Sequence, residues 1–222
     1  MGSIQIRGLY AIVDLPHRDG LDPIVVVDAM IEGGASVVQL RSKHAPLDPV
    51  VVRALGLRCH AGGVPLIIND ELELAEAGEL GVAGVHLGQT DLARLGGTPD
   101  ERRRRRASLR EAGLVLGIST HSCAQLRTTC DELDPDYVGF GPVFATGTKA
   151  NPEPVVGLAG LEAACAASAV PVVAIGGIGL DDALDLARRG AAAIAVIGAL
   201  TGPSPERIRE RALALSRAFA GE

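Results

Sequence analysis

The chain reads Asp136-Tyr137-Val138-Gly139-Phe140-Gly141-Pro142-Val143-Phe144-Ala145-Thr146-Gly147-Thr148-Lys149 in its second half, where an apolar segment is followed at once by glycines, threonines and a lysine. Glycines let the backbone approach a phosphate, threonine hydroxyls donate hydrogen bonds, and a lysine adds a mobile positive charge. The pattern predicts a strand that ends in an anion-binding loop. A surface hairpin would use the same turn residues, so this stretch alone leaves both interpretations open.

The same pairing of segments recurs along the chain. Short apolar runs alternate with amphipathic stretches rich in alanine, leucine and arginine, and the runs are continuous, which is typical of parallel strands covered on both faces. The predicted strands span residues 8–14, 36–41, 65–69, 83–87, 114–119, 136–140, 171–175 and 193–197. Eight strand-helix units in 222 residues predict an α/β fold, a (β/α)8 or TIM barrel, as a single domain over residues 1–222.

Charge and composition argue against several classes of partner. The formal net charge is -6, aromatic residues make up 2% of the chain and tryptophan is absent, so we expect no nucleic acid partner. Five consecutive arginines at 102–106 point in all directions around a predicted helix with acidic neighbours, which favours a solvated outer helix over a nucleic-acid patch. Without a signal-like N-terminus or a membrane-length apolar run, we expect no membrane partner and a cytoplasmic location. The residues leave the oligomeric state open, a homo-oligomer included.

Polar residues cluster where the predicted strands end, which is where TIM barrels collect their reacting groups. After the second to sixth predicted strands come Gln39, Arg41, Lys43, Asn69, Asp70, Gln89, Asp91, Ser119 and residues 146–149. Glycines, among them Gly177 and Gly198, follow the last two strands, at positions where backbone N–H groups of many barrels bind a phosphate. One face of the barrel is therefore predicted to bind phosphorylated small molecules.

Arg41 and Lys43 alternate at the second strand exit, so both side chains can reach the same mouth and hold a diphosphate. The alternative is a solvated pair of loop cations. The coincidence with three other loops suited to anions favours the diphosphate site.

Asp70 and Asp91 lie at the ends of adjacent predicted strands, which brings their carboxylates close together. Two carboxylates beside a diphosphate predict a bridging Mg²⁺, because this ion takes one or two protein oxygens and completes its shell with water and phosphate. The alternative for Asp70 is an N-cap of the helix that follows it, and the two roles are compatible.

Two histidines have open interpretations. His86 stands in an apolar segment, where it either faces the barrel mouth or is a hydrogen-bonded core histidine. His121 follows Ser119 and Thr120 at a predicted strand-to-helix turn, where it orients the loop or transfers a proton.

Taken together, the motifs resemble the signature set of the thiamine phosphate synthase family, in order along the chain. They are Gln39-Leu40-Arg41-Ser42-Lys43, Ile68-Asn69-Asp70, Gly84-Val85-His86-Leu87-Gly88-Gln89-Thr90-Asp91, Gly117-Ile118-Ser119, Gly141-Pro142-Val143-Phe144 with Thr146-Gly147-Thr148-Lys149, and Ile175-Gly176-Gly177-Ile178. Six separated motifs that agree in order are more specific than any one of them.

The resemblance implies a Mg²⁺-dependent transferase of thiamine biosynthesis. Its substrates would be 4-amino-2-methyl-5-hydroxymethylpyrimidine diphosphate and 4-methyl-5-(2-hydroxyethyl)thiazole phosphate, and its products thiamine phosphate and diphosphate. The pyrimidine diphosphate would be held by Gln39, Leu40, Arg41, Ser42, Lys43, Asn69, Ser119 and Lys149, of which Arg41, Lys43, Ser119 and Lys149 are the expected catalytic residues. The thiazole phosphate would be held by Thr146, Gly147, Thr148, Gly177, Ile197 and Gly198, and Mg²⁺ by Asp70 and Asp91.

The sequence departs from the family pattern at two named positions. Gly198 stands where relatives often have serine, which bears on thiazole phosphate affinity, and Ala145 stands where proline is common. Two rival functions remain. One is a thiazole tautomerase of the same fold, with His121 as its acid and base, and the other is a non-catalytic barrel that binds thiamine intermediates.

Overall fold

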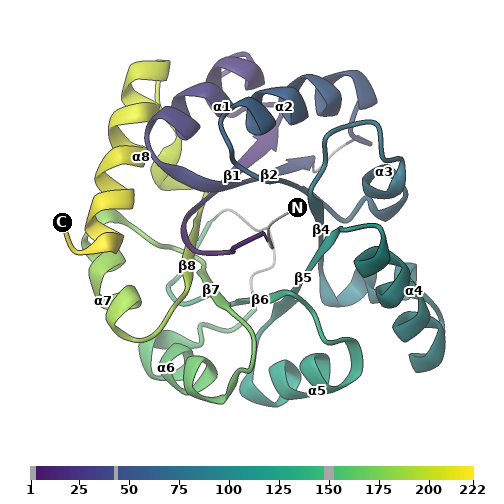
Figure 1. Ribbon diagram of the computed structural model, residues 1–222. Helices are drawn as coiled ribbons and strands as arrows, with labels where there is room; N and C mark the ends of the chain where they lie inside the picture. The colour runs from purple at the N-terminus through teal and green to yellow at the C-terminus, as the bar shows by residue number, and fades with distance from the viewer. Residues whose placement is uncertain (1–3, 43–44, 148–152) are drawn as a thin grey trace.

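Eight parallel strands, hydrogen-bonded in chain order, close into one barrel within the described residues of the computed structural model, which are 4–42, 45–147 and 153–222. Figure 1 shows this ring. The strands are β1 (Gly8–Leu15), β2 (Ala35–Ser42), β3 (Leu66–Asn69), β4 (Gly84–Leu87), β5 (Val115–Thr120), β6 (Tyr137–Phe140), β7 (Val172–Ile175) and β8 (Ala193–Val196). The predicted TIM barrel is confirmed.

Helices surround the barrel, and at least one helix follows each strand along the chain (Figure 1). They are α1 (Pro23–Glu32), α2 (Pro49–Ala61), α3 (Leu72–Glu76), α4 (Pro99–Glu111), α5 (Cys123–Leu133), α6 (Gly157–Ala167), α7 (Ala183–Arg188) and α8 (Pro205–Ala220), with short 3₁₀ helices η1 (Gln89–Leu95), η2 (Leu180–Asp182) and η3 (Gly198–Leu200). None of the described helices is both long and apolar enough to cross a membrane.

Successive strand residues face two different cores, as the period-two geometry of a strand requires. On β1, Leu9 and Ala11 pack outward against the helices, while Tyr10 and Ile12 point into the barrel. This alternation explains the continuous apolar runs in the sequence. Polar side chains such as Gln39, from strands of the same pattern, can therefore line the barrel interior.

The barrel closes between its first and last strands. Residues 8–11 of β1 pair in parallel with residues 193–196 of β8. Helices α1 and α8 pack against each other beside this seam, where a Cβ added at Gly33 would lie 2.5 Å from Ala212 Cβ. Glycine at position 33 therefore permits the close approach of the first and last helices.

The arginine run lies on the outer helix α4, and one of its five members, Arg106, is buried. Arg106 is 4% exposed. Its Nε donates to the Asp134 carbonyl at 3.0 Å, and its guanidinium lies 2.9 Å from Asp136 Oδ1. Three other arginines of the run form ion pairs at the surface: Arg102 with Glu132, Arg103 with Asp100, and Arg105 with Glu76. The run ties α4 to its neighbours.

Candidate active site at the barrel mouth

A hydrogen-bonded polar group occupies the carboxyl ends of β2 and β3. Gln39 is 4% exposed, and its Nε2 donates to Asn69 Oδ1 at 2.6 Å. Asn69 Nδ2 donates in turn to Asp70 Oδ2. The structure thus brings together three of the residues expected in the site, and each amide is oriented by its neighbour.

Arg41 at the end of β2 is held by a carboxylate that sequence reasoning missed. Its Nε and Nη2 donate to Asp14 Oδ1 and Oδ2 at 2.5 and 2.9 Å, and the two residues are register partners on β1 and β2. The Arg41 side chain is 17% exposed, so the solvated alternative is wrong for this residue. Asp14 follows an apolar strand as the other site residues do, a signal that could have identified it.

Asp70 adopts a left-handed backbone conformation, with φ of 62°, which is uncommon for residues other than glycine, asparagine and aspartate. Its Oδ1 accepts from the Gly88 N–H at 3.2 Å. Helix α3 begins at Leu72 after Glu71 and has no side-chain cap, so the N-cap interpretation of Asp70 is wrong. Burial first, and then the charge of Asp91, raise the pKa of Asp70.

Asp91 in η1 also lies close to Gly88. A Cβ added at Gly88 would lie 3.0 Å from Asp91 Oδ2. Asp91 also accepts from Thr90 Oγ1 at 3.1 Å and lies 3.6 Å from Arg94 Nε. Two carboxylates of like charge therefore flank one backbone position, and a cation placed between them would relieve their repulsion.

The donor set fits Mg²⁺ better than a transition metal. Among the described residues, no group of three or more histidine, cysteine, aspartate and glutamate side chains is arranged to hold a metal. Two carboxylates with the remaining ligands drawn from water and phosphate are the usual Mg²⁺ arrangement.

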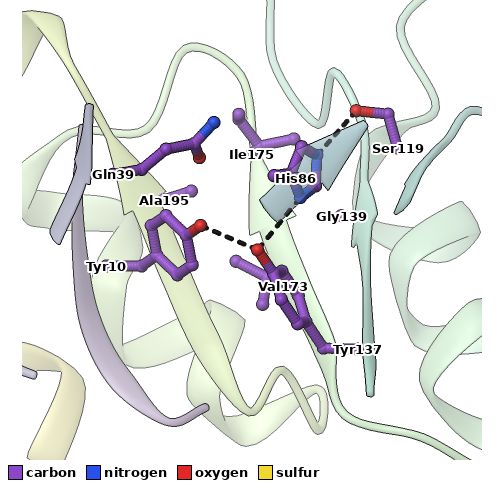
Figure 2. A pocket seen from close by; sticks show the side chains of 9 residues that line it. All are labelled: Tyr10, Gln39, His86, Ser119, Tyr137, Gly139, Val173, Ile175 and Ala195. Carbon is purple, nitrogen blue, oxygen red and sulfur yellow. Dashed lines mark hydrogen bonds between the residues drawn. The ribbon is translucent and has the colours of Figure 1, made fainter. Parts of the chain in front are cut away.

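Inside the barrel, His86 connects the mouth to two buried tyrosines (Figure 2). Its Nε2 lies 2.9 Å from Ser119 Oγ, and its Nδ1 lies 3.0 Å from the Tyr137 hydroxyl, which is 2.8 Å from the Tyr10 hydroxyl. His86 is therefore both hydrogen-bonded in the interior and in contact with a mouth residue. Burial raises the pKa of both phenols.

The tyrosines were missed because in the sequence they are indistinguishable from apolar strand residues. The signal that could have found Tyr137 is Gly117 on β5: a Cβ there would lie 2.1 Å from Tyr137 Cζ. The Gly117 position must lack a side chain for the Tyr137 ring to fit.

His121 orients the loops at the mouth, one of the two roles left open for it. Its Nδ1 lies 2.6 Å from the Gly141 carbonyl, and its backbone N–H donates to Gln125 Oε1 at 2.7 Å. The side chain thereby joins the exit of β5 to the exit of β6.

The exits of β6 and β7 pack together through backbone atoms. The N–H groups of Val143 and Phe144 donate to the carbonyls of Ile175 and Gly176 at 2.9 and 3.0 Å. Gly177 has φ of 68°, and a Cβ there would lie 2.5 Å from the Ala145 carbonyl oxygen. Because β6 and β7 pair in parallel, the segment that leaves β6 is not the turn of a hairpin, and the surface-hairpin interpretation is wrong.

The exit of β8 is open by comparison. Gly198 begins η3, and its φ lies outside the left-handed region. Apart from its two chain neighbours, none of the described residues has a heavy atom within 4 Å of a Cβ added there. Thr201 Oγ1 donates to the Gly198 carbonyl at 2.8 Å. A side chain at position 198 therefore has room.

Comparison with known proteins identifies the family of this chain. A family model described as thiamine monophosphate synthase matches residues 9–200. The chain belongs to the thiamine monophosphate synthase family. The family resemblance of the sequence motifs is confirmed, and the chain is accordingly a transferase of thiamine biosynthesis.

Relatives in the thiamine monophosphate synthase family match over nearly the whole chain. A thiamine-phosphate synthase of Anaeromyxobacter dehalogenans is 40% identical, covering 93% of this chain and 86% of the relative. A thiamine-phosphate synthase of Marinobacter nauticus is also 40% identical, and the match covers 99% of this chain and 96% of that relative. A solved thiamine phosphate pyrophosphorylase from Pyrococcus furiosus has a TM-score of 0.77 at 26% identity, covering 99% of this chain and 96% of that one.

The other residues assigned by the thiamine monophosphate synthase resemblance lie in the outer core, at strand exits or outside the described ranges. The Leu40 side chain packs in the outer core, and Ser42 Oγ donates to the Ala45 carbonyl at 2.5 Å. Ile197 packs against the inner core, and Thr146 and Gly147 lie on the loop after β6. Lys43, Thr148 and Lys149 lie outside the described residues.

Proposed function

We propose that the barrel mouth joins 4-amino-2-methyl-5-hydroxymethylpyrimidine diphosphate to 4-methyl-5-(2-hydroxyethyl)thiazole phosphate. The bond between the pyrimidine methylene carbon and the diphosphate oxygen breaks first, and its electron pair leaves with the diphosphate. The electron-rich aminopyrimidine stabilises the carbon cation. The thiazole nitrogen then donates its lone pair to that carbon, which gives thiamine phosphate and diphosphate.

The observation that carries this proposal is the anchored polar group at the exits of β2 and β3, in a chain of this family. Asp14 holds Arg41 through two hydrogen bonds, so the guanidinium is oriented before substrate arrives. Gln39 and Asn69 orient each other beside it. A dissociative substitution needs no protein nucleophile, and this set supplies what it does need: fixed charge and hydrogen-bond donors for a departing diphosphate.

Lys43 and Lys149 are proposed on sequence grounds to add positive charge around the diphosphate. Ser119 would contact the pyrimidine diphosphate from the exit of β5. These cations stabilise the transition state more than the ground state, because negative charge on the diphosphate oxygens grows as the C–O bond breaks.

Asp70 and Asp91 would hold Mg²⁺ in this proposal. When bound, the ion neutralises negative charge on the diphosphate. Asp70 is suited to this role because its carboxylate is half-buried near a second carboxylate, and both effects raise its pKa. Arg94, 3.6 Å from Asp91, would limit the charge of the pair before the ion binds.

The thiazole phosphate would lie across the exits of β6 to β8. The left-handed backbone at Gly177 and the open position at Gly198 allow backbone N–H groups to approach an anion closely. Thr146 and Thr148 would add hydroxyl donors from the loop after β6.

A tautomerase would not require the diphosphate and metal set of Gln39, Asn69, Asp70 and Asp91. The contact between His121 Nδ1 and the Gly141 carbonyl does not engage Nε2, so the absence of isomerase activity has to be tested directly. A non-catalytic barrel would not need the anchored Arg41. The cytoplasmic location and a homo-oligomeric state stay predictions.

The test is the formation of thiamine phosphate from the two purified substrates, with Mg²⁺ and with the ion removed by chelation. We expect product and diphosphate in equal amounts with Mg²⁺, and little product without it. Folded protein that binds both substrates but forms no product would favour the non-catalytic barrel. Isomerisation of a thiazole carboxylate phosphate in place of condensation would favour the tautomerase.

A further inference from the structure

Three hydrogen bonds link the centre of the barrel to its mouth, through Tyr10, Tyr137, His86 and Ser119 (Figure 2). We propose that Tyr137 is a positioning residue: it fixes the His86 ring with its proton on Nε2, so that the Ser119 hydroxyl hydrogen points at the substrate. This proposal rests on the proposed function only in naming that substrate as the pyrimidine diphosphate.

The direction of the chain follows from counting its hydrogens. Each phenol carries one donor hydrogen, and a neutral imidazole has one donor and one acceptor nitrogen. If Tyr10 donates to Tyr137 and Tyr137 donates to His86 Nδ1, then the ring proton lies on Nε2 and is donated to Ser119 Oγ. Every hydroxyl hydrogen inside the barrel is then used.

The opposite direction leaves a buried donor without an acceptor. Ser119 would donate to Nε2, Nδ1 would donate to Tyr137, and Tyr137 would donate to Tyr10. Tyr10 is 1% exposed, and within the described part of the chain its hydroxyl has a hydrogen bond with Tyr137 alone. Among the described residues its hydrogen would then have no protein acceptor, which is unfavourable for a buried hydroxyl.

A charged imidazole meets the same obstacle. With protons on both nitrogens, Nδ1 would donate to Tyr137 and again turn the Tyr137 hydrogen toward Tyr10. Burial raises the pKa of both phenols, so they remain donors at neutral pH and cannot accept as phenolates. The neutral ring with the proton on Nε2 is the one state that satisfies the chain.

The surroundings keep the His86 ring in place. A Cβ added at Gly139 would lie 3.3 Å from His86 Cε1, and the ring is stacked at a tilt of 32° with a 5.5 Å centroid separation from Tyr137. Because the ring cannot turn, the hydrogen bond that Tyr137 donates to Nδ1 keeps the Nε2 proton directed at Ser119 Oγ. The Ser119 hydroxyl then donates to an acceptor in the mouth, which in the pyrimidine diphosphate is a phosphate oxygen or a ring nitrogen.

The tautomer can be measured directly in the ligand-free protein. Protein labelled with ¹⁵N-histidine has five imidazoles, and the His86 signals are assigned by their loss in His86→Gln. Long-range ¹H–¹⁵N spectra near neutral pH should show a protonated Nε2 and an unprotonated Nδ1 for His86. A protonated Nδ1, alone or with Nε2, overturns the proposal whether or not the protein is a synthase.

Two matched variants separate Tyr137 from a general effect of removing a buried hydroxyl. Tyr137→Phe deletes the donor to Nδ1, so the proton should move partly or wholly to that nitrogen. Tyr10→Phe deletes a hydroxyl in the same interior but leaves Tyr137 as the donor, so the Nε2 proton should remain. Equal changes in the two spectra would contradict the assignment.

Kinetics then test whether Tyr137 acts through Ser119. Tyr137→Phe should lower kcat/KM for the pyrimidine diphosphate about tenfold in the parent, and much less in a Ser119→Ala background. A similar loss in both backgrounds, with melting temperatures matched, would show a structural role and overturn the proposal. If the parent forms no thiamine phosphate, the proposed function fails while the tautomer result still stands.

Discussion

The two halves of the barrel mouth are built in opposite ways. At the exits of β1 to β5, side chains hold one another: Asp14 holds Arg41, and Gln39 orients Asn69. At the exits of β6 to β8, missing side chains matter more, since a Cβ at Gly177 would meet the Ala145 carbonyl. We therefore expect the exits of β1 to β5 to be most sensitive to substitutions that remove side-chain groups. We expect the exits of β6 to β8 to be most sensitive to substitutions that add them.

The largest expected effect is on the side-chain half. Arg41→Met keeps an apolar stem but deletes the charge and removes the two hydrogen bonds that the guanidinium donates to Asp14. We expect kcat/KM for the pyrimidine diphosphate to fall about 100-fold, with KM for the thiazole phosphate nearly unchanged. Steady-state kinetics with each substrate varied in turn measure this. An equal loss for both substrates would abolish the distinction between the halves.

The second prediction concerns the backbone half. Gly177→Ala adds a methyl group where φ is 68° and the Ala145 oxygen is 2.5 Å away, so the free energy of unfolding should fall by about 2 kcal/mol. Gly198→Ala is the matched control, with open space around the new Cβ, and should change stability by less than about 0.5 kcal/mol. Urea unfolding of both variants measures the difference. Equal losses would show that the β7 exit is less crowded than the structure has it.

A third prediction tests the carboxylate pair. Asp70→Asn keeps a side chain that tolerates positive φ but removes the charge, so turnover should fall about tenfold and the rise in melting temperature on adding Mg²⁺ should disappear. Near-parental activity at limiting Mg²⁺ would contradict the metal assignment.

The same variant should change the pH dependence of stability without Mg²⁺. The raised pKa means that the folded state holds the Asp70 proton more tightly than the unfolded state does. The resulting stability is present at low pH and is lost as pH rises above the ordinary aspartate value and through the raised one. Asp70→Asn should lack this loss, which thermal melts across the acid range would detect.

The smallest effect is expected at Gly198. Gly198→Ser adds a hydroxyl at a position where the described residues leave room for a side chain. KM for the thiazole phosphate should fall a few-fold, because a displaced water offsets much of a new hydrogen bond. Weaker binding by a folded variant would show that close backbone approach matters more than the hydroxyl.

The barrel and the general position of its site could be predicted from the sequence. Continuous apolar runs identify strands covered on both faces, and the closed parallel fold brings every strand end to one mouth. For this reason Gln39, Asn69 and Asp70 could be grouped from the order of the strands and the residues that follow them. The order of the strands in the barrel is enough to place these three residues at the same mouth.

The pairings inside that mouth could not be predicted, because they depend on register and side-chain direction. Asp14 meets Arg41 only because β1 and β2 align these residues. Tyr10 and Tyr137 lie on β1 and β6, which are not neighbours in the ring, and nothing in either strand indicates that their hydroxyls meet. Arg106 is buried beside Asp136 although its neighbours in the run are not.

The seam between β1 and β8 has a consequence for synthesis of the protein on the ribosome. The partner of Gly8 is Ala193, so at usual rates of translation β1 waits about 10–40 s for the strand that completes its pairing. During that interval its hydrogen-bonding edge is open to other strands. The nascent chain therefore depends on keeping its first strand from pairing wrongly until β8 has been made.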